Sequence, residues 1–304
     1  MDAGEIPIPR LVTPRWAAVI VNYEAGPLLA ESVRAVLADT SAGPVEIVVV
    51  DNGSRDGSVR ELARELPDVQ VVRSPGNVGY ARGVNLGTAA TRAPIVAALN
   101  PDTRIEPGTA AALLARFDTQ PRLAACGPRI KNVDGTDYPS ARLVPSMPLA
   151  AMHGALGFWW PANPFTARYR QLDADPERAR LVDWLSGSAV WLRRGALDAV
   201  GSWDERYFMY LEDVDLCWRL RRAGWEVAYE PAGVVWHIQG TATARRPYRM
   251  LVAHHRSAWQ FARRRWTGAR AALLPFAAVF LAARAVVAIC AQAWGGRRSP
   301  ISTR

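Results

Sequence analysis

Three groups of acidic side chains follow apolar stretches of the chain and could do chemistry together. They are Asp51, Asp102 and the trio Glu212, Asp213 and Asp215. A carboxylate directly after a buried strand can simply cap the following turn or helix, and that interpretation stays open for each group taken alone. Capping does not require the groups to converge, whereas open α/β sheets bind ligands at the carboxyl edge of their strands. Convergence of the three groups would therefore indicate a site.

Aliphatic runs bounded by polar turns predict the buried strands of a parallel sheet, with helical patterns between them. Strand and helix alternate, which implies parallel pairing with right-handed crossovers. The glycines of the third intervening segment do not follow the order GxGxxG and come after the third strand, which disfavours a dinucleotide-binding fold. The strands are expected at 16–22, 45–50, 69–72 and 95–99, the helices at 27–37, 56–66 and 107–117, and a glycine-rich loop and helix at 76–87.

The alternation weakens in the second half of the chain. Residues 127–183 hold seven prolines and an aromatic cluster at 158–160, so we expect an irregular insert that shapes a substrate pocket or covers the sheet. Residues 182–194 predict an antiparallel strand. A helix should run from the acidic trio to about Ala223, followed by a short strand.

Helical spacing gives the members of the acidic trio different tasks. Glu212 and Asp215, and likewise Asp215 and Arg219, are neighbours on a helix, so we expect surface ion pairs or first-turn charges favoured by the helix dipole. Asp213 points elsewhere on that turn. It is therefore free to act as a general base, which must lie within hydrogen-bond reach of the proton that it takes.

Residues 100–102 present a carboxylate on a short, rigid segment. Pro101 fixes its own φ and keeps Asn100 extended, so Asp102 is held in a defined direction. One carboxylate together with diphosphate oxygens is a normal way to hold Mg²⁺ or Mn²⁺. His237 is the best nitrogen candidate to join them, although a lone histidine beside a tryptophan is more often structural.

The charge of the 304-residue chain is unevenly distributed. The formal net charge is +9, yet residues 245–304 hold twelve arginines and no acid, so the first 244 residues carry −3. Residues 246–266 read as a basic helix. The apolar run 271–294 is near the ~20 residues needed to span a bilayer, but it contains Arg284, and a central arginine costs about 3 kcal/mol. Because Arg270 and Arg284 are two heptads apart, we expect both on one side of a helix that lies in the membrane interface, with a solvated basic face as the alternative.

Other site classes lack their signatures. The three cysteines form no CxxC, which argues against a disulfide framework or a thiolate zinc site and suits a reducing, cytosolic setting. The first ten residues hold two acids and two prolines and no apolar stretch, so we expect neither a signal peptide nor a transit peptide. The chain has no GxSxG, no Cys/His pair and no P-loop, in keeping with a reaction that needs no protein nucleophile.

Six motifs of the chain resemble those of glycosyltransferase family 2, and more narrowly its rhamnosyltransferase branch. They occur in the family's order and approximate spacing over roughly residues 15–265. They are IVNYE at 20–24, VVDNGSRDGS at 49–58, GNVGYARGVNLG at 76–87, LNPDT at 99–103, YFMYLEDVDLCWRLRRAGW at 207–225 and WHIQG at 236–240.

The resemblance implies a GT-A fold, which is an α/β domain with a mostly parallel central sheet flanked by helices. Here a C-terminal basic and apolar helical appendage would follow it. The implied division is an N-terminal tail, a glycosyltransferase domain with a nucleotide-binding half and an acceptor half, and a membrane-associating tail. These parts cover residues 1–14, 15–244 (halves 15–126 and 127–244) and 245–304.

The resemblance also implies roles for single residues. Asp213 would deprotonate the acceptor hydroxyl as it attacks the anomeric carbon in one inverting displacement, with Glu212 and Trp184 at the acceptor site, although Trp184 could equally be core. Asp102 would bind Mg²⁺ or Mn²⁺ with His237 as a second ligand. The set implied for the nucleotide sugar is Asn22 and Tyr23 at the base, Asp51 at the pyrimidine edge, Asn52, Asn77, Gly79 and Arg82 beside the nucleotide, and Asn100 and Asp102, where Asn100 replaces an aspartate of many members.

The implied reaction moves L-rhamnose from dTDP-L-rhamnose to a polyprenyl-diphosphate-linked GlcNAc in cell-wall polysaccharide biosynthesis, peripherally at the cytoplasmic face of the cell membrane. The same fold with a galactofuranose, galactose or mannose donor stays open, as does a homo-oligomer. A basic-tailed nucleic-acid binder is the non-enzymatic alternative. It leaves the acidic groups without a role, so we expect no nucleic-acid partner.

Overall fold

A computed structural model of the protein describes residues 14–144, 147–157, 160–238 and 247–295. Several sequence-based expectations lie outside these ranges. They concern the N-terminal tail up to residue 13, Phe158 and Trp159 of the aromatic cluster, the last two residues of the WHIQG segment, Arg245 and Arg246, and the chain beyond residue 295.

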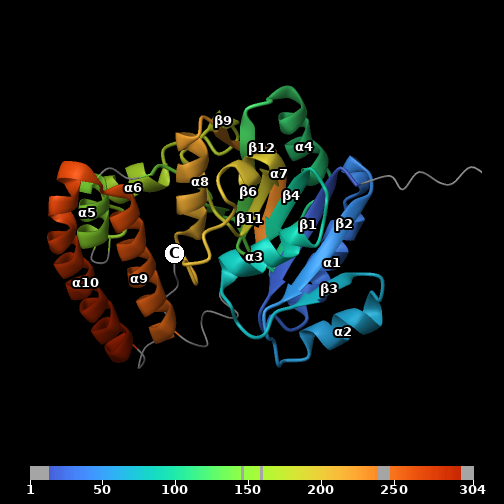
Figure 1. The fold of residues 1–304 in the computed structure, drawn as a ribbon, viewed down its shortest axis with the longest axis horizontal. Helices are drawn as coiled ribbons and strands as arrows, with labels where there is room; N and C mark the ends of the chain where they lie inside the picture. The colour runs from blue at the N-terminus through green and yellow to red at the C-terminus, as the bar shows by residue number, and fades with distance from the viewer. Residues whose placement is uncertain (1–13, 145–146, 158–159, 239–246, 296–304) are drawn as a thin grey trace, which may run out of the picture.

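The N-terminal half, up to residue 126, forms the alternating structure that its sequence predicts (Figure 1). Strand β1 is buried at every residue because it lies between two parallel neighbours, β2 and β4, inside a sheet covered on both faces. The elements are β1 (Trp16–Asn22), α1 (Leu28–Ala38), η1 (Thr40–Ala42), β2 (Val45–Asp51), α2 (Ser58–Glu65), β3 (Gln70–Arg73), α3 (Tyr80–Ala89), β4 (Ile95–Leu99), β5 (Thr103–Ile105) and α4 (Thr109–Thr119).

The second half continues the same sheet, in the order β3-β2-β1-β4-β11-β6-β12-β5. The predicted antiparallel strand is present as β11, which runs antiparallel to both β4 and β6, while β6 and β12 are parallel. The elements are β6 (Leu123–Asn132), β7 (Asp137–Tyr138), β8 (Ala141–Arg142), α5 (Met147–Leu156), α6 (Pro164–Arg170), β9 (Arg180–Leu181), β10 (Trp184–Leu185), β11 (Ala189–Arg193), α7 (Arg194–Ala199), α8 (Glu212–Arg222) and β12 (Glu226–His237).

The expectation of an irregular insert from residue 127 onward is wrong for its first six residues. They belong to β6, which runs on to Asn132 inside the sheet. Gly127 and Pro128 hide this strand in the sequence because both residues normally interrupt strands. The sheet accommodates them: Gly127 packs directly against the Leu185 side chain, and Pro128 pairs with Glu230 where β12 has an irregularity in its register.

Three helical segments complete the described chain: α9 (Pro247–Arg265), η2 (Gly268–Leu273) and α10 (Leu274–Gly295). Figure 1 shows α9 and α10 side by side with α5 and α6, at the end of the molecule away from α2 and β3. The helical stretch from Gly268 to Ala293 is, by length and composition, long and apolar enough to cross a membrane. Its most apolar window has a mean hydropathy of 2.3, and none of that window is buried inside the protein. Its side chains at Phe276 and Val279 are 73% and 71% exposed.

Arg284 does not face outward from α10. Its Nε donates to the Gly154 carbonyl oxygen at 3.1 Å, and its Nη1 lies 3.0 Å from His255 Nε2, so the guanidinium is held between α5 and α9. Arg270 lies in η2, before α10 begins. The expectation that Arg270 and Arg284 share one side of a single α-helix is therefore wrong, because the 3-10 segment changes the periodicity between them.

Candidate active site

The ends of β1 and β2 carry the first predicted site residues. Asn22 and Asp51 are register partners on these parallel strands, and the Asn52 N–H donates to the Asn22 carbonyl oxygen at 2.8 Å. Asp51 Oδ1 accepts a 2.9 Å hydrogen bond from the Ser54 N–H, which closes the turn after β2. Asp51 is thus fixed at the carboxyl edge of the sheet, the usual ligand edge of open α/β folds.

Asn22 and Tyr23 differ in accessibility. The Asn22 side chain is fully buried, and its amide donates to the hydroxyl oxygens of Ser54 and Ser58 at 3.0 and 2.9 Å. Its Oδ1 is buried without a hydrogen-bond partner among the residues that the structure describes. Tyr23 is half-buried. Asn22 therefore supports the turn after β2, and Tyr23 is the more accessible of the two for stacking on a base.

A hydrogen-bond network joins the turn after β2 to the loop before α3. Asn52 Nδ2 donates to Asn77 Oδ1 and to the Gly79 carbonyl oxygen, both at 3.2 Å. Asn52 Oδ1 accepts the Val78 N–H at 3.0 Å, and Asn77 Oδ1 also accepts the Gly79 N–H at 3.1 Å. The structure thus brings Asn52, Asn77 and Gly79 together beside Asp51.

Gly79 is also the point where the N-terminal half meets the loop before α8. Its φ is +91°, and a Cβ there would lie 2.5 Å from the Phe208 carbonyl oxygen, so only glycine fits without a displacement. The Tyr80 N–H donates to the same oxygen at 3.0 Å. Arg82 is exposed on α3, and its Nε lies 3.5 Å from a carboxylate oxygen of Glu205.

Asp102, Asn100 and His237 converge where β4 ends and β12 ends. His237 Nε2 lies 3.2 Å from Asp102 Oδ1 and 3.3 Å from Asn100 Nδ2. The register between β5 and β12 pairs Thr103 with His237, and the Ile238 N–H donates to the Asp102 carbonyl oxygen at 2.9 Å. Strand pairing, rather than local sequence, therefore brings His237 to the carboxylate from 135 positions along the chain.

The three side chains suit a divalent cation only in part. A carboxylate and an imidazole nitrogen are accepted ligands of such ions, and the Asn100 amide could turn its oxygen inward. His237 Nδ1 is buried and has no hydrogen-bond partner in the described part of the chain. Within the described ranges, no group of three or more His, Cys, Asp or Glu side chains is placed to hold a metal. A cation bound by Asp102 and His237 would thus need oxygens of its substrate to complete its shell.

Asp213 stands at the start of α8 and is held by backbone groups. Its Oδ2 accepts the Gly187 N–H at 2.9 Å, and its Oδ1 accepts the Val214 N–H at 2.8 Å. The two residues before α8, Tyr210 and Leu211, have φ values of +69° and +62°, which is uncommon for residues with side chains. Such backbone strain clusters at functional sites, where the surrounding structure holds it.

Glu212 and Asp213 are neighbouring carboxyl residues, of which Glu212 is buried and Asp213 half-buried. Burial and the charge of Asp213 raise the pKa of Glu212 well above its ordinary value. Burial also raises the pKa of Asp213, against the opposing effect of the N–H groups of Gly187 and Val214. The hydrogen bonds from the Gly187 and Val214 N–H groups favour the ionised form of Asp213. Of the two carboxyl groups, Asp213 is therefore the better candidate to accept a proton.

Tyr80 connects the acidic groups and is a residue that sequence reasoning did not single out. Its buried hydroxyl donates to the Gly187 carbonyl oxygen. Burial, and then the charges of Glu212, Asp213 and Asp102, raise the pKa of this phenol well above its ordinary value. Two of the three acidic groups therefore converge on one phenol, and its position in the GNVGYARG motif is the only sequence signal for it.

A short turn before β11 links the two sides of the site. Gly187 binds Asp213 through its N–H, and the neighbouring Ser188 carbonyl oxygen accepts the Asn100 N–H at 2.8 Å. The segment from Ser186 to Ser188 thus spaces the Asp102 side from the Asp213 side. Asp51 lies in the adjacent nucleotide turn, which reaches the α8 loop through Gly79.

The expectation of a surface ion pair between Asp215 and Arg219 is wrong. Their side chains are 0% and 9% exposed, and the Asp215 carboxylate lies 2.7 Å from Arg219 Nε. Arg264 of α9 covers the pair, with Nη1 3.3 Å from Asp215 Oδ1. Helical spacing correctly predicts the partners, but their burial depends on a helix that lies far along the chain.

Trp184 occupies a core position beside a half-buried cation, Arg142. It is 5% exposed, and its indole N–H donates to the Leu143 carbonyl oxygen at 2.9 Å. The Arg142 guanidinium carbon lies 5.0 Å from the Trp184 ring centroid and 5.4 and 5.8 Å from those of Tyr138 and Tyr169. Arg142 comes from the irregular stretch of sequence, where no pattern marks it.

The sequence matches the family described as glycosyltransferase-like family 2 over residues 14–265. The chain belongs to this family. Among curated proteins, the N-acetylglucosaminyl-diphospho-decaprenol L-rhamnosyltransferase of Mycobacterium tuberculosis (strain ATCC 25618 / H37Rv) is 42% identical over 261 residues, which cover 82% of this glycosyltransferase and 84% of the relative. The pre-mycofactocin glycosyltransferase of the same strain is 31% identical over 203 residues, covering 66% and 39% of the two chains. The predicted enzyme class is confirmed.

Solved structures support the fold of this glycosyltransferase. The mannosyltransferase PcManGT from Pyrobaculum calidifontis, in complex with GDP-Man and Mn²⁺, has a TM-score of 0.58 at 17% identity, covering 96% of this chain and 77% of that one. GalNAc-T7 with UDP, GalNAc and Mn²⁺ has a TM-score of 0.56 at 16% identity, covering 75% and 44%. The predicted GT-A fold, with its mostly parallel sheet flanked by helices, is confirmed.

Proposed function

We propose that this enzyme transfers L-rhamnose from dTDP-L-rhamnose, with inversion, to GlcNAc-diphosphate carried on a polyprenol. The observation that carries the proposal is the 42% identity to the mycobacterial rhamnosyltransferase, because the match covers 82% of the chain and so includes both the Asp102 side and the Asp213 side. The name of that relative gives the sugar and the lipid-linked acceptor. The geometry of the site supports the reaction type.

On the donor side, the chain offers a turn and a carboxylate cluster. Asp51 and Tyr23 would contact the base, and the loop with Asn77 and Gly79 would flank the nucleotide. Asp102 and His237, whose facing atoms are 3.2 Å apart, would hold Mg²⁺ or Mn²⁺. Bound there, the ion supplies positive charge to the departing diphosphate. Its identity does not follow from the ligand types, because both ions accept them.

On the acceptor side, Asp213 would take the proton. A bond forms between the acceptor hydroxyl oxygen and the anomeric carbon, while the bond from that carbon to the diphosphate oxygen breaks. The diphosphate leaves with the electron pair, and the hydroxyl proton passes to Asp213. Its two backbone N–H partners hold the carboxylate in one orientation during the transfer, and the neighbouring Glu212 would contact the acceptor.

The helical tail fits an enzyme that takes its acceptor from a membrane. Apolar side chains of α10 such as Phe276 and Val279 are exposed, while Arg284 is turned inward against α5 and α9. An exposed apolar helix next to basic helix α9 would bind an anionic membrane surface from one side. We therefore place the enzyme peripherally, at the cytoplasmic face.

A donor panel tests the proposal. Purified enzyme is incubated with a GlcNAc-diphosphate lipid and, in parallel, labelled dTDP-L-rhamnose, dTDP-galactose, UDP-galactofuranose and GDP-mannose, each with and without Mg²⁺ or Mn²⁺. We expect metal-dependent label in the lipid from dTDP-L-rhamnose alone. Transfer from another donor would discard the rhamnose assignment and keep the fold and mechanism.

A further inference from the structure

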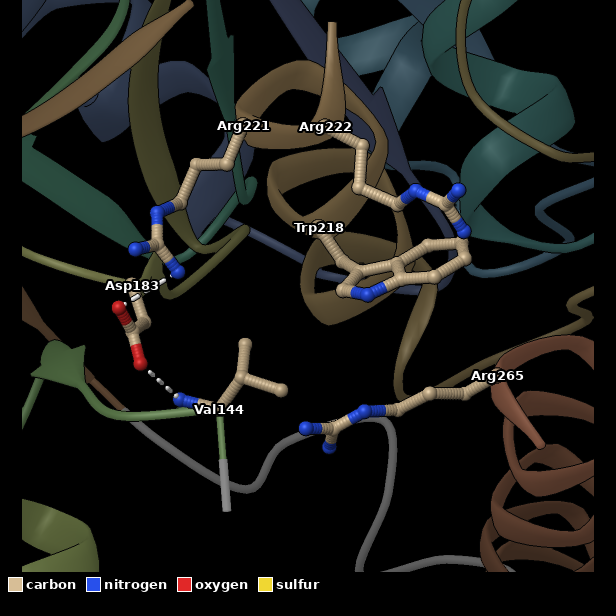
Figure 2. A pocket seen from close by; sticks show the side chains of 6 residues that line it. All are labelled: Val144, Asp183, Trp218, Arg221, Arg222 and Arg265. Atoms are coloured by element: carbon tan, nitrogen blue, oxygen red, sulfur yellow. Dashed lines mark hydrogen bonds and ion pairs between the residues drawn. The ribbon is translucent and has the colours of Figure 1, made fainter. Parts of the chain in front are cut away.

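A cavity of about 360 Å³ lies away from Asp102 and Asp213, between the C-terminal end of α8 and the end of α9. Three guanidinium groups from two helices surround it (Figure 2). The residues that line it are Val144, Asp183, Trp218, Arg221, Arg222 and Arg265.

The cavity carries an excess of positive charge. Among the lining residues that the structure describes, the only carboxylate is that of Asp183, and it is already engaged: Oδ1 lies 2.6 Å from Arg221 Nη1, and Oδ2 accepts the Val144 N–H at 2.8 Å. One acid therefore faces three arginines, which leaves about two positive charges. Arg222 lies over the Trp218 ring, 5.0 Å from its centroid, so the indole positions that guanidinium beside the hollow.

Helix-dipole effects explain part of this arrangement. Arg221 and Arg222 are in the last turn of α8, where cations are favoured. Arg265 is in the last turn of α9, so the ends of two different helices direct their cations to the same cavity (Figure 2). Burial and the charge of Arg270 lower the pKa of Arg265, while the charge of Asp183 opposes this shift. A bound anion would stabilise the charged form of Arg265.

The cavity adjoins the apolar surface of the tail. Arg265 is the last residue of α9, and the exposed side chains of Leu273, Phe276 and Val279 follow within fourteen residues. Arg222 follows Asp213 by nine positions along α8, which corresponds to about 14 Å along the helix axis. The cavity is thus beside the candidate membrane-binding helix and distinct from the position of the reacting sugar.

We propose that Arg222 and Arg265, with Trp218, form a site for a phosphate group of a membrane lipid headgroup. Arginine forks bind phosphate oxygens in pairs, which a general basic surface does not arrange. The inference deepens the proposed function, since it assumes that the enzyme works on a membrane. Two lipids could supply the phosphate, a phospholipid or the diphosphate-linked acceptor, and the test has an arm for each.

The test compares the full-length double variant Arg222→Gln/Arg265→Gln with Arg64→Gln/Arg92→Gln, which removes the same charge from exposed positions outside the cavity. Arg221 is left in place to keep the Asp183 pair. Binding is measured by co-sedimentation with phosphatidylcholine vesicles containing or lacking phosphatidylglycerol. Each arginine near an anionic membrane surface contributes roughly one order of magnitude or less to the binding constant. We therefore expect the cavity variant to bind phosphatidylglycerol vesicles about thirtyfold more weakly than wild type, and the control variant to bind them less than about threefold more weakly.

The second arm uses a water-soluble, short-chain alkyl-diphosphate-GlcNAc without vesicles. If phosphatidylglycerol binding is unchanged but the KM for this acceptor rises at least tenfold in the cavity variant alone, the phosphate comes from the acceptor. If neither quantity differs from the control variant, and both variants unfold at the same urea concentration as wild type, the site does not exist. Vesicle binding needs no transfer of sugar, so failure of the rhamnosyltransferase proposal would be visible separately.

Discussion

Gly79 carries the contact that joins the loop before α3, which we propose to flank the nucleotide, to the loop before Asp213, the proposed general base. Its φ and ψ are +91° and 168°, a region that residues with a side chain enter at a cost of about 1–3 kcal/mol. A Cβ at this position would also lie 2.5 and 2.9 Å from the carbonyl oxygen and Cα of Phe208, and relieving such overlap costs a further 1–3 kcal/mol or so. Gly79→Ala should therefore lower the free energy of unfolding by about 4 kcal/mol.

Gly108 provides a matched control for that substitution. Its φ is +92°, but no atom lies within 4 Å of the Cβ that alanine would add. Gly108→Ala should cost only the backbone strain, about 1–2 kcal/mol. Urea unfolding of both variants gives the two free energies, and steady-state transfer gives kcat. We expect Gly79→Ala to lose kcat as well, because Phe208 precedes the Tyr210–Leu211 turn that sets Asp213.

The comparison can refute the reasoning directly. If the two alanine variants lose the same stability within about 0.5 kcal/mol, Gly79 and Phe208 do not approach as closely as the structure places them. If Gly79→Ala is the less stable but keeps wild-type kcat when assayed well below its unfolding temperature, the nucleotide loop does not position the base.

Three further predictions concern the site itself. Tyr80→Phe should lower kcat about tenfold because the Gly187 carbonyl oxygen loses its hydrogen-bond donor. Tyr207→Phe is the control: it loses only a 3.4 Å hydrogen bond to the Asp215 carboxylate and should keep the wild-type kcat. Equal kcat values for the two variants would show that Tyr80 has no role in the site. The pKa of Glu212 is raised, so its protonated form stabilises the fold, and this stabilisation is lost as pH rises above 4.5, the ordinary pKa of a glutamate. The free energy of unfolding of Glu212→Gln should therefore fall less with rising pH than that of wild type. Parallel curves for the two proteins would contradict the raised pKa of Glu212. Asp102→Ala should weaken metal-dependent donor binding in a thermal-shift titration, and an unchanged metal titration would move the cation elsewhere.

Much of the nucleotide-binding half follows from local sequence. The strands at 16–22, 45–51 and 95–99 are aliphatic runs that end in polar turns, and such runs mark buried parallel strands without further context. Asp51 and Asp102 are predicted at the carboxyl edge because they directly follow those strands. Strand β5 could not be predicted, since three residues carry no periodicity and its partner β12 lies some 130 residues along the chain.

The contacts within the site depend on tertiary structure that no local pattern contains. Tyr80 lies in the motif at 76–87 and Gly187 in the strand predicted at 182–194, yet their hydrogen bond spans 107 positions. The burial of Asp215 likewise comes from α9, through Arg264. Residue spacing along one helix predicts which side chains are neighbours, but packing of a later helix determines whether the pair is exposed to solvent.

The most direct test of the account is transfer by Asp213→Asn. The amide keeps the size of the side chain but cannot take a proton, so we predict that the variant binds dTDP-L-rhamnose with a wild-type thermal shift and transfers sugar about 10²–10⁴-fold more slowly. Wild-type turnover by a variant that folds and binds donor would contradict the account, because Asp213 is the carboxylate that two backbone N–H groups hold at the start of α8 and that we propose as the base.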